Sequence, residues 1–153
     1  MKEGYGKEEN KKIIYEGTYH NNLKSGKGLC YFKLLEDKYE GEFKNNNING
    51  KGIYTWIKDG NYFKGNFING QMNGLGLFVW NDGSKYYGYY KNNIKEGKGK
   101  FIWPDGKCFE GNFLNGQPHG KGIITITDEN KKIISSNEVE YENGKLIWYM
   151  TKK

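Results

Sequence analysis

Two glycine-centred patterns recur along this chain with one common period. In the first, an aromatic residue lies two positions before a glycine and another lies two positions after it, as in Tyr39-Gly41-Phe43. Successive glycines of this pattern are 24, 24, 23 and 23 residues apart: Gly17, Gly41, Gly65, Gly88 and Gly111. A Gly-x-Gly pair, as in Gly50/Gly52, recurs at the same intervals. Two independent patterns with one period indicate a repeat protein.

Each repeat has the pattern of a β-hairpin. Over residues 39–43, aromatic residues and glycine alternate with acidic residues, the period of two that separates the two faces of a strand. A polar loop over residues 45–49 is expected to follow. On the second strand, glycines and rings share one face: Gly50, Gly52, Tyr54 and Trp56. The pair Asp59-Gly60 then predicts a tight turn, because glycine readily adopts positive φ.

The composition agrees with such a repeat. Aromatic residues make up 16% of the chain and glycine contributes 23 residues, whereas aliphatic residues are scarce. Rings that lie over bare backbone can replace an aliphatic core, because each buried ring removes roughly 150–250 Å² from water. The sequence therefore predicts an all-β protein, a single antiparallel sheet of consecutive hairpins in which each hairpin contacts only its neighbours.

The residues that carry the pattern resemble the MORN repeat (membrane occupation and recognition nexus). The similarity is carried by residues 39–54, by Trp103-Pro104-Asp105-Gly106 and by Pro118-His119-Gly120-Lys121-Gly122. It predicts one domain over residues 1–153, with a partial opening repeat at 1–12, five full repeats at 13–127 and degenerate capping strands at 128–153, where Val139 replaces a glycine. The resemblance implies an elongated, twisted sheet with a groove on its glycine and aromatic face.

The same resemblance implies a non-catalytic interaction module. In layout the chain is similar to small retinophilin-type MORN proteins, which hold a myosin tail in the groove. We therefore expect binding of a cytoskeletal or membrane-associated protein, in the cytoplasm, at the cytoskeleton or the inner membrane face. The aromatic side chains expected to line the groove are Tyr39, Phe43, Tyr54, Trp56, Phe63, Phe67, Phe78, Trp80, Tyr90, Phe101, Trp103 and Phe113. The same rings also serve to hold the sheet together, and the opposite face is expected to be solvated.

The net charge of +6 leaves an alternative partner open. Every cation is a lysine, and attraction of lysines to an anionic membrane surface is the alternative function. The lysines alternate with acidic residues, which weakens this reading, and the absence of arginine disfavours nucleic acid. The apolar tail Lys145–Lys153 is expected to seal the last edge of the sheet, and a homodimer contact is its alternative role.

No group of residues points to catalysis. His20 and His119 are the only histidines, and both are expected in loops. Cys30 and Cys108 are expected roughly 30 Å apart, too far for a disulfide, and point to a reducing, intracellular setting. We therefore expect no enzymatic activity, no catalytic residues, no metal and no cofactor.

Overall fold

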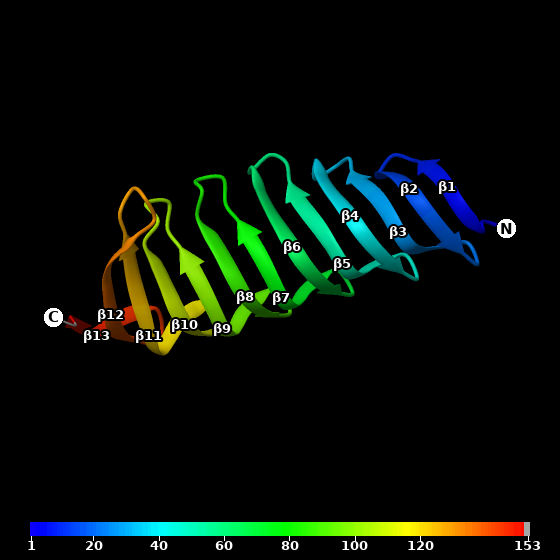
Figure 1. Ribbon diagram of the computed structural model, residues 1–153. Coiled ribbons are helices and arrows are strands. Elements are labelled where there is room, and N and C mark those ends of the chain that lie inside the picture. The colour runs from blue at the N-terminus through cyan, green and yellow to red at the C-terminus, as the bar shows by residue number, and fades with distance from the viewer. Residues whose placement is uncertain (152–153) are drawn as a thin grey trace.

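A computed structural model describes residues 1–151 as one open antiparallel sheet of thirteen strands (Figure 1). The strand order in space is the order in the chain, and each strand is hydrogen-bonded to its neighbours in sequence. The strands are β1 (Gly4–Glu9), β2 (Ile13–His20), β3 (Leu23–Phe32), β4 (Asp37–Lys44), β5 (Asn47–Trp56), β6 (Asn61–Ile68), β7 (Gln71–Val79), β8 (Lys85–Lys91), β9 (Ile94–Ile102), β10 (Cys108–Leu114), β11 (Gln117–Thr127), β12 (Ile133–Glu142) and β13 (Lys145–Thr151). The predicted all-β, single-layer architecture is confirmed. Lys152 and Lys153 of the predicted capping tail lie outside the described residues.

The two ends of the hairpins use different turns. At one end, two consecutive residues have positive φ, as at Asn45 (49°) and Asn46 (69°), which is the geometry of a type I′ turn. The polar loop predicted over residues 45–49 is therefore a two-residue turn, and β5 begins at Asn47. At the other end, only the glycine of the Asp-Gly pair has positive φ. The amide of Gly83 donates to the carbonyl of Trp80 at 3.0 Å, so Asp82-Gly83 belongs to a longer connection between β7 and β8.

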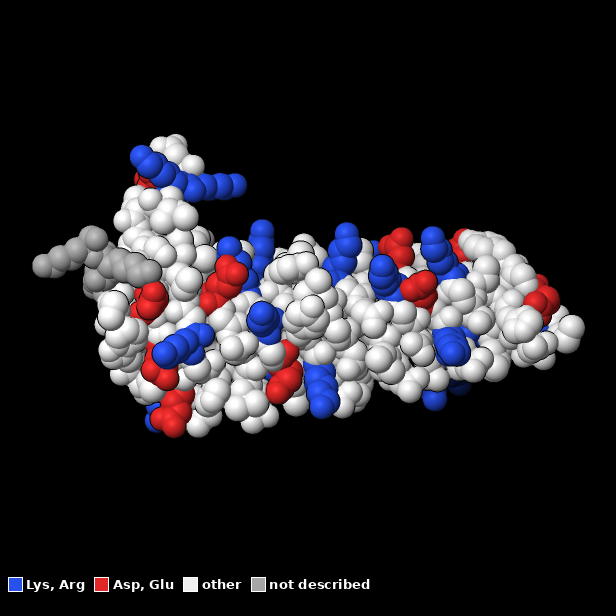
Figure 2. Space-filling model, turned by 60° about the horizontal axis from the view of Figure 1, so that its bottom comes forward, with Lys and Arg blue, Asp and Glu red and all other residues white. Residues whose placement is uncertain are grey.

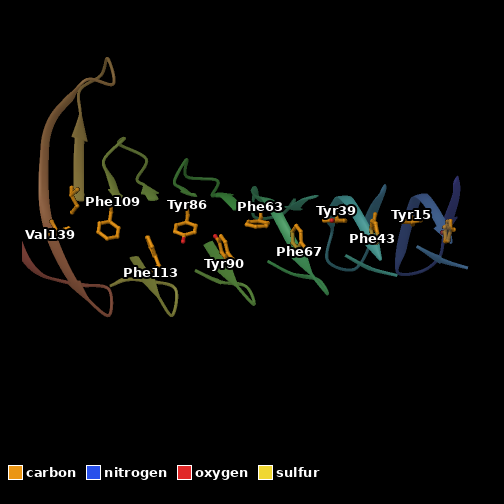
Figure 3. Packing of buried hydrophobic residues seen from close by; sticks show 13 residues of the cluster. Tyr15, Tyr39, Phe43, Phe63, Phe67, Tyr86, Tyr90, Phe109, Phe113 and Val139 are labelled. Atoms are coloured by element: carbon orange, nitrogen blue, oxygen red, sulfur yellow. The ribbon is translucent and has the colours of Figure 1, made fainter. Parts of the chain in front are cut away.

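The core consists of two rings from each first strand of a repeat, and the hairpins curve around this row of rings (Figure 3). The leading ring of each repeat is completely buried, as Tyr39 and Phe63 are. It lies over a glycine of its own strand and a glycine of the next strand. A Cβ on Gly28 would lie 2.6 Å from the Tyr15 ring, well inside van der Waals contact. The side chain that glycine lacks is thus replaced by a ring from the neighbouring strand.

The core rings also contact one another in an unbroken zigzag. Tyr39 meets Phe43 at a centroid distance of 5.2 Å and Phe67 of the next repeat at 5.4 Å, both edge to face. The same alternation continues to Phe109, which meets Tyr141 at 5.0 Å. Edge-to-face geometry brings the positive ring edge to the negative ring face, which adds about 0.5–1.5 kcal/mol per pair beyond burial. We call these rings the core ladder: Tyr15, Tyr19, Tyr39, Phe43, Phe63, Phe67, Tyr86, Tyr90, Phe109 and Phe113.

The two glycines of each Gly-x-Gly pair have separate roles, although the sequence pattern placed both on one face of the strand. Gly52 is the glycine that lies beneath the Tyr39 ring. Gly50 instead has a φ of 104° and sits where the register slips: Gly41 pairs with Gly52 whereas Phe43 pairs with Ile48. The first glycine therefore forms a bulge that bends the second strand, and the second glycine makes room for the ring.

The last repeat replaces both the leading ring and the glycine of the first strand. Asn137 stands where earlier repeats place the leading ring, and Val139 stands where they place glycine, paired with Gly122. Both side chains are buried. A valine fits at this position because no ring extends over it, so the loss of the ring and the gain of the side chain occur together.

Candidate interaction surfaces

The twelve aromatic residues predicted to line a groove divide into two equal sets. The first six belong to the core ladder and are at most 5% exposed: Tyr39, Phe43, Phe63, Phe67, Tyr90 and Phe113. The protein covers these rings with its own chain, because the bulged strands bend around them. They provide almost no surface for a partner. Their involvement in binding stays a prediction, and the structure gives them a packing role.

The other six rings lie beside the core ladder and are only partly buried. We call them the outer ring row: Tyr54, Trp56, Phe78, Trp80, Phe101 and Trp103. Each contacts the next, with centroid distances of 4.4 Å between Phe78 and Trp80 and 5.6 Å between Trp80 and Phe101. One end is fixed by a hydrogen bond of 2.8 Å from the Tyr54 hydroxyl to Asp37, and this bond adds to burial in raising the pKa of Tyr54. The row therefore offers a continuous aromatic strip across several hairpins.

One further position of the repeat faces the rings, although strand alternation in the sequence did not reveal it. It is the residue that pairs with the second core ring: Lys24, Ile48, Met72, Lys95 and Pro118. A cation or an apolar side chain occupies it from one repeat to the next. The signal was present in the sequence, since each residue lies five positions after a core ring, but the expected loop concealed it.

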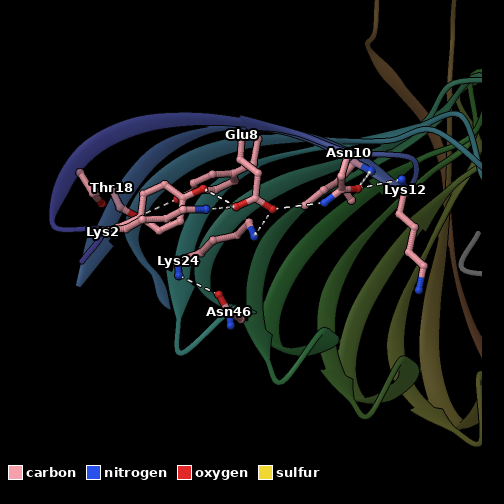
Figure 4. A network of polar contacts seen from close by, with 10 residues as sticks. Lys2, Glu8, Asn10, Lys12, Thr18, Lys24 and Asn46 are labelled. Atoms are coloured by element: carbon pink, nitrogen blue, oxygen red, sulfur yellow. Dashed lines mark hydrogen bonds and ion pairs between the residues drawn. The ribbon is translucent and has the colours of Figure 1, made fainter. Parts of the chain in front are cut away.

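At the N-terminal end, the lysine at this position belongs to a polar network (Figure 4). Lys24 Nζ lies 3.6 Å from a Glu8 carboxylate oxygen and 5.1 Å from the centre of the Tyr15 ring. Lys2 donates to Glu8 at 2.7 Å, and the Tyr19 hydroxyl donates to the same carboxylate at 3.1 Å. The hydrogen bond from Lys2 is the main reason why the pKa of Glu8 lies below its usual value. Lys2 and Lys24 therefore both have the Glu8 carboxylate as an opposite charge.

Lys95 has different surroundings. Its Nζ lies 4.8 Å from the Trp80 ring centre, 5.1 Å from Tyr86 and 5.4 Å from Phe101. Burial among these rings lowers the pKa of Lys95. None of the ion pairs between residues 1 and 151 includes it. Lys95 thus places a partly buried charge, held only by ring faces, beside the middle of the outer ring row.

Two open hollows lie on the face of the sheet opposite the rings. The larger has a volume of about 1040 Å³, and its floor is the backbone of glycines in β8 to β11. Rings fill the space over these glycines on one face, and the hollow adjoins them on the other. Exposed apolar side chains stand around it: Leu75, Tyr87, Tyr89, Ile123 and Trp148. This face is therefore a second surface with the character of an interface.

Charges of both signs are mixed along the sheet. Figure 2 shows lysine and acidic side chains interspersed over the visible face. Around the larger hollow, Lys98, Lys100 and Lys121 alternate with acidic residues, and Lys100 Nζ lies 4.0 Å from a Glu110 oxygen. Diffuse attraction to an anionic surface needs several unopposed cations on one side. The arrangement gives little support to that mode of binding.

The residues with chemically reactive side chains are dispersed. Cys30 and Cys108 are buried free thiols, and burial raises the pKa of Cys30 to about 11. His20 Nδ1 lies 2.8 Å from a Glu3 carboxylate oxygen, and His119 Nδ1 accepts from the Asn143 amide at 3.3 Å. Within residues 1–151 no cluster of histidine, cysteine and acidic side chains could hold a metal ion. The same residues include no helix suited to crossing a membrane.

Comparison with known families agrees with this architecture. The MORN repeat matches five successive segments, at residues 15–33, 39–60, 63–85, 86–108 and 109–131. These segments cover most of the chain, and the chain belongs to the MORN-repeat family. Membership indicates a protein-interaction module.

Other comparisons are less informative. No curated protein sequence matches the chain significantly. Among solved structures, the chain is similar to the TCP domain of SAS-4 (dCPAP) of Drosophila melanogaster, solved in complex with a proline-rich motif of Ana2 (dSTIL). That match has 11% sequence identity and a TM-score of 0.46, and covers 97% of this chain and 90% of the other.

Proposed function

We propose that the protein is a non-catalytic interaction module that binds a segment of a partner protein along the outer ring row. The observation that carries this proposal is the unbroken run of partly exposed rings from Tyr54 to Trp103. A single-layer sheet has no second layer to cover such a strip. Tyrosine and tryptophan are frequent anchors of binding energy, because they bury a large area with few rotatable bonds.

The interior of the sheet also restricts how a partner can bind. Between β2 and β12 every strand is hydrogen-bonded on both sides, so a partner cannot add a strand there. It must therefore be held by side-chain contacts. A helix satisfies its own backbone hydrogen bonds and suits this strip, and an extended segment suits it if its backbone stays hydrated. From the family we propose a cytoskeletal or membrane-associated protein as the partner, with a myosin tail as one example, and a cytoplasmic location.

Affinity capture with three baits tests this proposal. The baits are the wild-type chain, Trp80→Ala on the outer ring row, and Tyr87→Ala on the opposite face. We expect the captured partner to be lost with Trp80→Ala and kept with Tyr87→Ala. Thermal unfolding followed by circular dichroism establishes that each bait is folded, and Trp80→Leu replaces Trp80→Ala if the alanine variant is not.

Two results would contradict the proposal. Loss of the partner with Tyr87→Ala alone would place the interface on the opposite face. Salt-sensitive sedimentation with acidic liposomes, without any captured protein, would favour the membrane as the partner.

A further inference from the structure

The repeat offers an internal control for the role of Lys95. Its counterparts Ile48 and Met72 are apolar and pack against the core, so the fold does not need a cation at this position. Lys24 is a cation, but Glu8 neutralises it at 3.6 Å. Lys95 alone in this set combines a charge with no ion-pair partner among the described residues. A structural role in the fold does not account for that combination.

The surroundings of Lys95 make its charge costly in the free protein. An ammonium group that loses water must regain the lost hydrogen bonds or pay in free energy. The faces of Trp80, Tyr86 and Phe101 attract the cation but accept no strong hydrogen bond. The three donors of the ammonium group therefore depend on the side that the rings leave open. A partner on the outer ring row must cross this point, because Trp80 and Phe101 belong to both features.

We infer that the Lys95 ammonium is the binding site for a carboxylate of the partner. This carboxylate belongs to an aspartate or glutamate that is flanked by apolar side chains. This inference rests on the proposed binding along the outer ring row. The apolar side chains pack on Trp80 and Phe101 and exclude water, and the carboxylate supplies the opposite charge that Glu8 supplies to Lys24. A charge-assisted hydrogen bond in a water-excluded interface is stronger than one at an open surface.

Two other surfaces of the sheet do not specify the chemistry of a partner. The hollow on the opposite face carries lysines and acidic residues in alternation, so its charge specifies no partner. The edge strand β13 exposes apolar side chains on both faces, but nothing in the structure shows what pairs with it. Lys95 instead calls for a carboxylate. Its apolar counterpart Met72 suggests Lys95→Met as a variant that removes the charge and keeps a residue the position accepts.

Selection from a displayed library of random 12-residue peptides provides the test. The library is panned against the wild-type chain, Lys95→Met and Trp80→Leu. We expect peptides from the wild type to be enriched in aspartate or glutamate beside leucine or aromatic residues, and this enrichment to disappear with Lys95→Met. A selected peptide is then compared with its Glu→Gln or Asp→Asn form in solution. The wild type should prefer the acidic form by about tenfold, the scale of one charge-assisted hydrogen bond, and Lys95→Met should bind both alike.

The outcomes separate this inference from the function on which it rests. Peptides that require Trp80 but show no acidic preference would overturn the inference and leave the proposed function intact. Recovery of no peptide that depends on Trp80 would count against both. Equal acidic preference in Lys95→Met would also overturn the inference, as would loss of binding to phosphatidylserine vesicles in Lys95→Met without any change for peptides. Lys24→Met serves as the matched control and should retain the acidic preference.

Discussion

The core ladder and the outer ring row are built from the same kinds of residue, yet only one of them is sealed from water. Rings of the core ladder lie over glycines and are enclosed by strands bent at the bulges. Rings of the outer row follow the bulge on the second strands and lie beside the core, partly exposed. The difference teaches that aromatic content alone does not identify a binding surface in such a repeat. The position of each ring relative to the glycine and the bulge decides whether it stabilises the fold or faces solvent.

The strongest test of this comparison is a methyl group added beneath the ladder. In Gly76→Ala, the new Cβ would overlap the Phe63 ring, which cannot move without opening the core. We expect a loss of about 4–5 kcal/mol in the free energy of unfolding, in the range of severe core defects. Gly74→Ala is the control: its site is open, and its φ of 74° should cost only about 1–2 kcal/mol. Urea denaturation measures both, and equal losses would contradict the separate roles of the paired glycines.

Truncation of rings tests the same contrast from the other side. Phe63→Ala empties a completely buried site and should cost about 3–4 kcal/mol. Phe78→Ala removes a partly buried ring of the outer row, and we expect a loss of about 1–2 kcal/mol because less area leaves the core. Thermal or urea unfolding of the two variants measures how much free energy of unfolding each one loses. A Phe78→Ala variant as unstable as Phe63→Ala would make the outer row part of the core.

The network around Glu8 should give the N-terminal end its own dependence on pH. The folded pKa of Glu8 is lowered by the hydrogen bond from Lys2. A carboxylate with a lowered pKa stabilises the fold above its unfolded pKa of about 4.3, and this contribution disappears as the pH falls through the folded value. Glu8→Gln should therefore lower the melting temperature at about pH 6 and have little effect near pH 3. A difference that stayed constant over this range would show that the charge of Glu8 is not responsible.

The smallest effect is expected at Tyr90, where the ladder contains a defect. Its hydroxyl is buried and has no hydrogen-bond partner within residues 1–151, whereas the hydroxyls of Tyr39 and Tyr86 donate to backbone carbonyls. Three of the other four repeats have phenylalanine at this position, namely Phe43, Phe67 and Phe113. Tyr90→Phe should therefore leave stability unchanged or raise it by about 0.5–1 kcal/mol, because a buried unpaired hydroxyl is costly. Destabilisation in urea would indicate that the hydroxyl has a partner in solution.

These features differ in how far the sequence could reveal them. The period, the hairpins and the ring-over-glycine pairing followed from residue spacing, because strand alternation depends on local geometry. The separate roles of Gly50 and Gly52 did not follow from spacing. Simple strand alternation places both glycines on one face, because it takes no account of the bulge at Gly50. The burial of Phe43 compared with the exposure of Trp56 depends on how sharply the strand bends, which spacing does not record. Lys95 was missed because its counterpart Ile48 fell within the polar loop expected over residues 45–49, which is in fact a two-residue turn.

The strictly sequential strand order also has a mechanical consequence. Force applied between the two ends of the molecule would act across the strands, so each interface would carry the whole load in turn. Hairpins would then peel away singly, each lengthening the tether by about 80 Å for its 23 or 24 residues, and would rejoin the remaining sheet when the tension fell. Such a molecule would resist stretching weakly and would lengthen in steps of nearly equal size, one for each repeat.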